Sequence, residues 1–299
     1  MCDKGYGSDV LEGQVAALPS NIKTNQASPG NFTEQSFFHS SYAGGIALVK
    51  NAIFIQSWHL DWQVTYRRIK LPTVENHMMA RLPRKDRLCL LAVCEPINLH
   101  SAEVLCEPGQ SLPYVYFPLN STISLQALVE GSPGVEVGMV GREGMLGSQV
   151  ALGVTTAPMH AHVQAAGPAY RIKTSNFCKE LTRSLALRSS MNHYLYMRMV
   201  QMTTSAACLR FHPIGQRLAR WLLMSQDRAA ADSFHVTHEL LAYMLGTRRE
   251  GITAAAGALQ SLGLIEYTRG YLTVLDRKGL EAAACGCYAV DQGTYANLM

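Results

Sequence analysis

The segment over residues 237–263 reads THELLAYMLGTRREGITAAAGALQSLG. Thr237 is a suitable cap for a helix over 238–245 that stops at Gly246, and a second helix is expected over 247–262. Each helix has one apolar face, made of Leu241 and Leu245 in the first and of Ile252, Ala255, Ala256 and Leu259 in the second. Two short amphipathic helices joined by a tight turn with a glycine are typical of a helix-turn-helix.

Two short strands follow, over 264–267 and 271–275, and Thr268-Arg269-Gly270 joins them. A hairpin directly after the second helix makes the unit a winged helix. In such units the second helix lies in the major groove of DNA, and residues near its N-terminus contact base edges. We therefore expect base contacts from Thr247, Arg248, Arg249, Glu250 and Thr253.

The residue types at these positions fit base reading. Arginine can donate two hydrogen bonds to guanine, and a carboxylate can accept one from cytosine. Arg269 at the tip of the hairpin is suited to a phosphate, a contact that adds affinity without sequence information. The alternative is that the two helices only pack together and that Arg248, Arg249 and Glu250 form a solvated first turn; the hairpin favours DNA binding.

The composition is that of a globular protein with about two domains. The chain has 299 residues, of which 48% are apolar and 16% charged, with 12 prolines. These values exclude disorder throughout, which needs few apolar residues, and a collagen-like chain, which needs far more Gly and Pro. The most apolar run near the start, residues 44–58, is interrupted by Lys50, Asn51 and Gln56. It is shorter than the roughly 20 residues that span a bilayer, so no membrane association is expected.

The net charge of +4 is mild and lies late in the chain. Lys and Arg counted against Asp and Glu give 0 for residues 1–80, +1 for residues 81–187 and +3 for residues 188–299. The start, MCDKGY, lacks the basic stretch and apolar core of a secretion signal. We therefore expect a cytoplasmic protein whose cysteines are reduced.

Residues 1–80 are expected to form a partly disordered N-terminal extension. Up to residue 44 they are rich in Ser, Gly, Asn and Gln, which favours a flexible tail, and residues 46–71 are apolar enough for a strand or two. Met78 and Met79 stand directly before an expected helix start, so an alternative is that translation begins at one of them.

Residues 81–184 predict a β-rich domain. A helix is expected over 81–94, where apolar residues have helical spacing. Short apolar stretches then recur between turn signals such as Pro108-Gly109 and Gly167-Pro168; they are 103–105, 114–117, 123–129, 135–140, 160–164 and 169–172. Many short strands separated by turns predict a β-barrel or a sandwich-like unit.

A long helix is expected over 185–212. Its apolar stripe consists of Leu187, Met191, Leu195, Met199 and Met202. The stripe either packs on the β-rich domain of its own chain or pairs with the same helix of a second subunit, and we favour the dimer. A DNA-binding domain over 213–284 and a C-terminal tail over 285–299 complete the expected organisation.

Several segments, in order, resemble the Crp/Fnr family of bacterial transcription regulators. They are Glu107-Pro108-Gly109, Val115-Tyr116-Phe117-Pro118, Val140-Gly141-Arg142-Glu143-Gly144-Met145-Leu146-Gly147 and the helix-turn-helix, and the resemblance covers residues 81–284. It implies an α+β fold in three parts. These are an N-terminal β-roll of the jelly-roll-like cyclic-nucleotide-binding type, a long dimerisation helix and a C-terminal winged helix-turn-helix.

The resemblance also implies a sensor that departs from the members that bind cyclic AMP. In those members a Gly-Glu pair holds the ribose and a later Arg pairs with the cyclic phosphate; Glu143 resembles that Glu, but Met159 stands where the Arg would fall. A buried phosphate without a cationic partner is strongly disfavoured. We expect no response to cyclic AMP unless Arg142 turns inward. Any effector is an unidentified small molecule, with expected contacts at Gly141, Arg142, Glu143, Gly144, Met145, Leu146, Gly147, Thr203 and Thr204.

The second helix of the helix-turn-helix, which is expected to contact bases, departs from the family in one position. Arg249 and Glu250 match the family's Arg-Glu pair, but Ala254 stands where a further Arg is expected one turn later. One base contact fewer corresponds to about 1–3 kcal/mol of discrimination. The preferred DNA site is therefore expected to differ from the commonest one of the family.

No metal site and no cofactor are expected. Oxygen-sensing members hold an iron–sulfur cluster with N-terminal cysteines, and the spacing of Cys89, Cys94 and Cys106 does not match one. Cys285 and Cys287 form a CxC pair that would need two further ligands, which the sequence does not identify.

We therefore expect a homodimeric regulator of the Crp/Fnr type that is not an enzyme. It would bind a roughly palindromic double-stranded DNA site, with RNA polymerase as a further candidate partner. The alternative is a ligand- or protein-binding module whose winged helix does not read DNA. A weaker alternative is a metal-dependent enzyme that uses His160 and His162, which share a strand face but lack a third ligand at suitable spacing.

Overall fold

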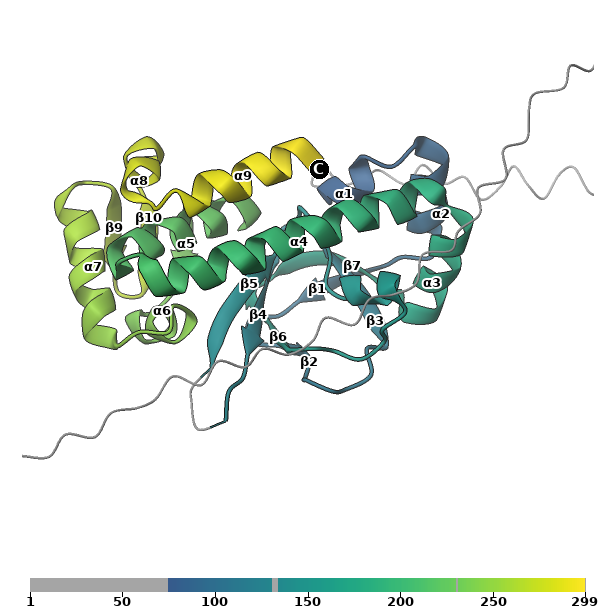
Figure 1. Ribbon diagram of the computed structural model, residues 1–299, viewed down its shortest axis with the longest axis horizontal. Coiled ribbons are helices and arrows are strands. Elements are labelled where there is room, and N and C mark those ends of the chain that lie inside the picture. Colours follow the sequence, from purple (N-terminus) through teal and green to yellow (C-terminus); the bar gives the residue numbers. More distant parts are fainter. Residues whose placement is uncertain (1–74, 131–133, 230, 299) are drawn as a thin grey trace, which may run out of the picture. The chain divides into compact units, whose positions relative to one another are not determined.

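The computed structural model describes residues 75–130, 134–229 and 231–298 (Figure 1). The described residues all belong to one unit of the chain, which spans Arg68–Met299. The expectations for residues 1–74 lie outside this part of the chain. Within it, no helix has both the length and the apolar character needed to cross a lipid bilayer.

Two antiparallel sheets form an N-terminal β-roll. The first has the strand order β1-β7-β3, with β1 at Glu95–Leu99, β7 at Gly167–Lys173 and β3 at Tyr114–Pro118. The second has the order β2-β6-β4-β5, with β2 at Val104–Cys106, β6 at His160–Ala165, β4 at Thr122–Ala127 and β5 at Val135–Val140. The expected β-rich domain of the α+β fold is confirmed.

Side chains from both sheets fill the interior of the β-roll. Val115 and Phe117 of β3, Ile123 of β4 and Val163 of β6 are completely buried. Phe117 also meets the ring of Phe177 edge-on, with 5.9 Å between ring centroids. Burying each such side chain contributes about 1.5–3 kcal/mol before the opposing conformational entropy. These apolar residues hold the two sheets together.

Short helices close the β-roll. They are α1 (His77–Ala80), α2 (Arg84–Ala92), the 3-10 helix η1 (Ser148–Leu152) and α3 (Thr174–Arg183). Asn76 caps α1 and donates from Nδ2 to the carbonyl oxygens of Pro118 and Gly144 at 3.0 and 2.7 Å. Met78 and Met79 are buried in the same core. The β-roll therefore begins before residue 81, and a chain that started at Met78 would lack the buried bonds of Asn76.

A long helix, α4 (Leu185–Phe211), connects the β-roll to the C-terminal part of the chain. The Ser184 hydroxyl caps it by accepting from the Leu187 amide at 3.0 Å, and Pro213 follows its end. In Figure 1, α4 runs along the length of the β-roll and the C-terminal helix α9 (Cys287–Leu298) lies beside it.

The C-terminal part is a compact unit, here called the head. It consists of α5 (Ile214–Ala229), β8 (Ser233–His235), α6 (His238–Met244), α7 (Arg249–Ser261), β9 (Ile265–Thr268), β10 (Tyr271–Val274) and α8 (Arg277–Ala283). The strand order is β8-β10-β9. Leu218, Leu222, Leu241, Ile252 and Leu272 are completely buried in its core. This is the expected winged helix-turn-helix.

Several elements differ from the expectations, among them α9 and β1. Residues 287–298 form the helix α9, so the prediction of a C-terminal tail was wrong. The segment shows little apolar periodicity, and its packing against α4 and α5 stabilises it instead. The strand β1 was not among the expected strands; it contains Pro96, which is tolerated there because β1 lies at the edge of its sheet.

Candidate DNA interface and sensor site

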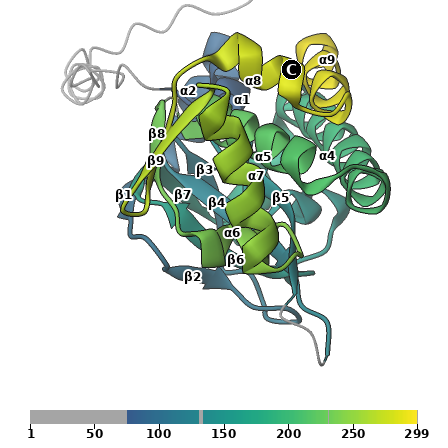
Figure 2. The ribbon, with the colours of Figure 1, turned by 90° about the vertical axis from the view of Figure 1, so that its left-hand side faces the viewer.

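The helix-turn-helix exposes the residues expected to read bases. The Thr237 hydroxyl caps α6 by accepting from the Leu240 amide at 3.1 Å, and Gly246 turns the chain with φ of +55°. Arg248 is the N-cap of α7. The side chains of Arg248, Arg249, Glu250 and Thr253 are exposed and that of Thr247 is half-buried. Figure 2 looks onto the end of the molecule that α7 crosses.

Thr253 is already engaged by its neighbours. Its hydroxyl donates to the Arg249 carbonyl oxygen at 3.0 Å and lies 3.0 Å from Nδ1 of His238. The His238 ring stacks on Tyr267 of β9, with 4.4 Å between centroids. Burial, and then the charge of Arg249, lower the pKa of His238. His238 thus links the first turn of α7 to the hairpin.

The hairpin presents Arg269 at its tip. Arg269 and Gly270 have φ of +51° and +86°, and Thr268 pairs with Tyr271 on either side of them. Two residues of positive φ form the turn that suits the twist of a two-residue hairpin. Arg269 is exposed, so its guanidinium is available to a phosphate.

The turn over residues 141–147 divides into two parts. Met145 and Leu146 are buried in the core of the β-roll, and a side chain on Gly147 would collide with Leu112 and Val115. Gly144 lies against the ring of Tyr194, whose hydroxyl donates to the Met145 carbonyl oxygen at 3.1 Å. The second part of the predicted effector-contacting turn therefore packs against the core.

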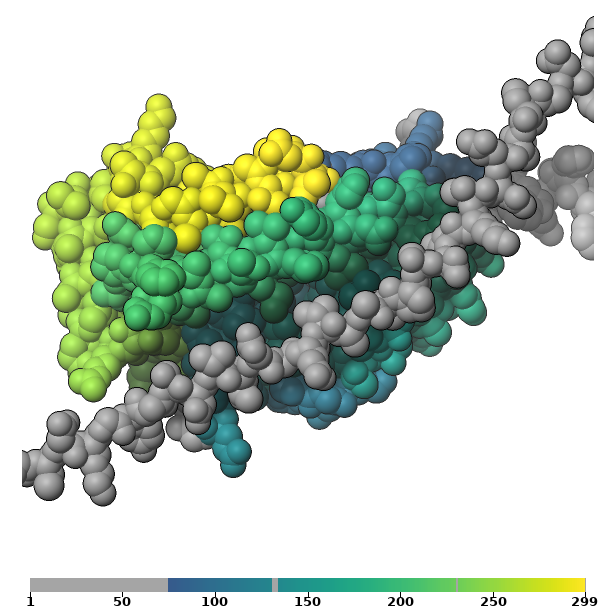
Figure 3. Space-filling view, in the orientation of Figure 1, coloured from purple at the N-terminus to yellow at the C-terminus, as the bar shows by residue number. Residues whose placement is uncertain are grey.

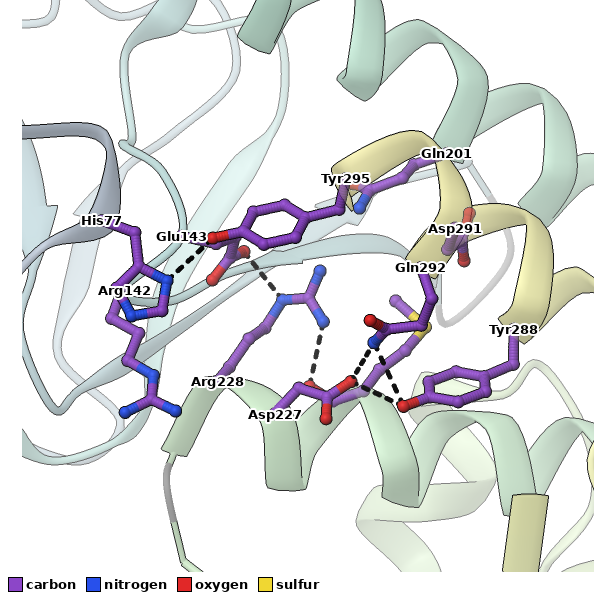
Figure 4. Close-up of a pocket in the computed structure, with 11 residues that line it drawn as sticks. His77, Arg142, Glu143, Gln201, Asp227, Arg228, Tyr288, Asp291, Gln292 and Tyr295 are labelled. Carbon is purple, nitrogen blue, oxygen red and sulfur yellow. Dashed lines mark hydrogen bonds and ion pairs between the residues drawn. The ribbon is translucent and has the colours of Figure 1, made fainter. Parts of the chain in front are cut away.

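The first part of the turn faces a cavity of about 220 Å³ (Figure 4). Its lining residues come from the turn, α1, α4, α5 and α9; they are His77, Arg142, Glu143, Gln201, Met224, Asp227, Arg228, Tyr288, Asp291, Gln292 and Tyr295. The lining residue from α4 is Gln201, and the expected contacts Thr203 and Thr204 do not line this cavity.

Glu143 is paired within the chain. Its carboxylate accepts from Nε of Arg228 at 2.9 Å and from the Gly141 amide at 3.1 Å, and both charged side chains are almost completely buried. Arg228 belongs to α5 of the head, and its aliphatic chain lies directly over Gly141. The residue that resembles the ribose-binding Glu therefore joins the β-roll to the head.

Residue 159, where the family members that bind cyclic AMP have the Arg that pairs with the phosphate, is apolar in this chain. Met159 packs against the core of the β-roll, and its carbonyl oxygen accepts from the Cys106 thiol at 3.7 Å. The next residue, His160, pairs with Glu107 at 2.8 Å. Arg142 lines the cavity beside His77 and does not enter the interior of the β-roll.

Only part of the apolar stripe expected on α4 is available to a second subunit. Leu187 and Met191 are buried in the core of their own β-roll, so the inclusion of these two in the seam was wrong. The reason is that α4 packs on the core of the β-roll from Leu187 to Met197. Leu195 is half-buried, whereas 65% of Met199 and 45% of Met202 are exposed.

The CxC pair has two potential metal ligands beside it that the sequence did not identify. Cys285 and Cys287 lie near Cys208 and His212 of the distant end of α4. The sequence could not identify these two because the ligands are far apart along the chain, with Cys285 lying 77 positions after Cys208. The sequence does contain one indication of this cluster. Cys208 and His212 are spaced one helical turn apart at the end of a helix.

Comparisons with known proteins agree with this architecture. Residues 216–283 match the family model of the Crp-like helix-turn-helix domain. Among solved structures, FixK2 from Bradyrhizobium japonicum is 14% identical, with a TM-score of 0.56 over 64% of this chain and 98% of that chain. The c-di-GMP responsive global regulator CLP of Xanthomonas campestris is 17% identical, with a TM-score of 0.53 over 64% and 99%.

A CRP-family transcriptional regulator from Thermus thermophilus is also 17% identical, with a TM-score of 0.53 over 63% of this chain and 96% of that chain. At these identities the similarity establishes the fold. No curated protein matches the chain by sequence.

Proposed function

We propose that this chain, which has the fold of Crp/Fnr regulators and a Crp-like helix-turn-helix domain, is a homodimeric, sequence-specific DNA-binding transcription regulator. The observation that carries the proposal is the exposed start of α7, where Arg248, Arg249 and Glu250 extend from a helix-turn-helix. Arg269 at the tip of the hairpin adds a phosphate contact. Arginine and glutamate at these positions can read guanine and cytosine in the major groove.

The exposed face of α4 supports the dimer. Leu195, Met199, Met202, Ala206 and Leu209 follow one another at intervals of four, three, four and three residues, which is the heptad spacing of a coiled coil. Met199, Met202 and Leu209 are exposed large apolar side chains. Two copies of α4 packed along this stripe would cover them and bring two heads to one side of the dimer. Two heads related by a two-fold axis fit two half-sites of a palindrome.

The β-roll is the sensor in this proposal, and it does not respond to cyclic AMP. Met159 provides no charge for a cyclic phosphate, and Glu143 is held by Arg228. A ligand that competes for Glu143 would separate the β-roll from the head. A ligand can shift that equilibrium only through different affinities for the two arrangements.

Selection of duplexes from a random DNA library tests the proposal. Wild type should enrich a two-fold symmetric motif, and Arg249→Ala should change the preference at one position in each half-site. Arg84→Ala is the matched control, because Arg84 is also an exposed arginine at the first position of a helix but lies on the β-roll. No enrichment by wild type at low salt, with or without cell extract as a source of effector, would favour a protein-binding winged helix instead.

A further inference from the structure

Four potential metal ligands meet where α4 joins the head. Their ligand atoms, from Cys208, His212, Cys285 and Cys287, all lie within 4.8 Å of one another. Cys208 and His212 stand one turn apart at the end of α4, and Cys285 and Cys287 flank Gly286 between α8 and α9. Figures 1 and 3 show that the start of α9 lies along α4 in this region.

The distances between these atoms fit a tetrahedral metal site. Sγ of Cys208 is 3.5 Å from Sγ of Cys285, and Sγ of Cys287 is 3.5 Å from Nδ1 of His212. A metal with bonds of about 2.3 Å to sulfur and about 2.0 Å to nitrogen places neighbouring ligand atoms about 3.5–3.8 Å apart. The remaining separations, none above 4.8 Å, would close through small side-chain rotations.

The burial of the three thiols also favours a metal site. The side chains of Cys208, Cys285 and Cys287 are 3%, 5% and 9% exposed, and they form a cluster separate from the cores of the β-roll and the head. Their sulfur atoms face one another and an imidazole. Thiolate and imidazole ligands in a closed four-coordinate set select zinc among the common divalent cations. We propose that Cys208, His212, Cys285 and Cys287 bind one zinc ion.

The charges around the cluster suit this ion. Binding releases the three thiol protons to solvent and forms three sulfur–metal bonds and one nitrogen–metal bond, with no transfer of electrons. Three thiolates and one divalent cation leave a net charge of −1. Arg217 and Arg220 of α5 line the cavity next to Cys208. Arg220 is already paired with Asp291 at 2.6 Å, so Arg217 contributes most of the positive charge near the site.

The position of the site gives it a role at the head. Cys208 and His212 precede the matched helix-turn-helix domain at residues 216–283, and Cys285 and Cys287 follow it. A metal ion would therefore tie both ends of the head to the end of α4 and fix its orientation. This role in regulation rests on the proposed function, because the orientation matters only if two heads read two half-sites.

Metal content and cobalt spectroscopy test the site without DNA. Wild type purified in reductant without added metal should hold close to one zinc per chain. After chelation, Co²⁺ should give the thiolate charge-transfer band and the intense visible bands of a tetrahedral site, and Zn²⁺ should displace them. Absence of both signals in wild type, or a Cys208–Cys285 disulfide in freshly isolated protein, would overturn the proposal.

Variants separate this cluster from adventitious binding. His212→Ala and the double variant Cys285→Ser/Cys287→Ser should lose the cobalt spectrum, whereas Cys89→Ser, at an exposed cysteine of α2, should keep it. Full retention of metal by His212→Ala and by the double variant would refute the assignment. His212 is half-buried at a helix end, so His212→Ala should fold. This variant therefore tests the site even if the double variant does not fold.

Binding to the selected duplex tests the role of the metal. Chelated and zinc-loaded wild type should differ in affinity by at least about fivefold, the lower end of typical coupling between two sites. Equal affinities of metal-loaded and chelated protein would overturn the regulatory role. Loss of DNA binding in both states, with one metal still bound, would instead contradict the proposed function and leave the metal site standing.

Discussion

The Glu143 carboxylate and the Arg228 guanidinium meet at 2.9 Å, with 11% and 7% of the two side chains exposed. Glu143 lies in the turn after β5, and Arg228 lies in the last turn of α5, so the pair joins the β-roll to the head. Removing one member of a buried pair leaves an uncompensated charge, which costs roughly 3–5 kcal/mol. The pair is therefore a site at which an effector could change the position of the head.

We predict that Glu143→Gln lowers the free energy of unfolding by about 3 kcal/mol, because Arg228 is then left buried without its partner. The matched control is Glu95→Gln. Glu95 pairs with Arg171 at the same distance of 2.9 Å, but 47% and 35% of these side chains are exposed. An exposed pair contributes about 0–1 kcal/mol. Urea denaturation of both variants makes the comparison, and equal losses would show that burial does not strengthen the Glu143 pair.

A second contact between the β-roll and the head involves Glu136 of β5. Its carboxylate accepts from the Ser124 hydroxyl at 2.6 Å and from Nε1 of Trp221, on α5, at 2.8 Å. Burial raises the pKa of Glu136 to about 7, against the opposing effects of these two hydrogen bonds and of Arg228 and Arg198. The folded protein therefore binds this proton more tightly than the unfolded chain does.

Stability should consequently depend on pH through Glu136. The contribution is fully present below the unfolded pKa of 4.5 and is lost as the pH rises to about 7. One pKa unit corresponds to about 1.4 kcal/mol, so the loss between pH 5 and pH 8 is on the order of 2–3 kcal/mol. Glu136→Gln should abolish this part of the pH dependence, while Glu130→Gln, at an exposed position, should keep it. An unchanged pH profile in Glu136→Gln would contradict the assignment.

The sequence predicts local structure well where one face of an element is apolar. The helix-turn-helix, the strand over residues 135–140 and the long helix α4 occur at or within two residues of the expected bounds. By contrast, α9 has no clear apolar face and contains Gly293, and its contacts with α4 and α5 stabilise it. The period of the apolar residues shows which face of an element is buried, but it does not show which other element packs on that face.

The same limit applies to the sites. The sequence identifies Arg248, Arg249 and Glu250 because they are adjacent and a motif places them. It does not pair Glu143 with Arg228, or Cys208 with Cys285, because each pair joins residues more than 70 positions apart. It also places Leu187 and Met191 in the wrong interface. An apolar stripe on a long helix contains both intramolecular and intermolecular contacts, and their spacing is the same.

The apolar stripe of α4 gives a prediction about the dimer. Met199→Glu should raise the dimer dissociation constant by at least about tenfold, or about 1.4 kcal/mol, because it would place two carboxylates opposite each other in an apolar seam. Met199 is 65% exposed, so the variant should fold normally. His193→Glu, on an exposed part of α4 outside the stripe, is the control. Sedimentation equilibrium measures both, and equal dissociation constants would place the dimer interface elsewhere.

Arg249 and Arg269 should differ in what they contribute to DNA binding. Arg269→Ala removes one phosphate contact from each subunit of the dimer, so it should weaken binding to all duplexes alike and reduce the slope of log affinity against log salt by about 1.8, or about 0.9 for each contact. Arg249→Ala should reduce discrimination at one base pair by about 1–3 kcal/mol. Titration of matched and mismatched duplexes at several salt concentrations, with Arg84→Ala as the control, separates the two effects. A variant of Arg269 that changed sequence preference would mean that the hairpin enters a groove and reads bases, since a phosphate contact carries no sequence information.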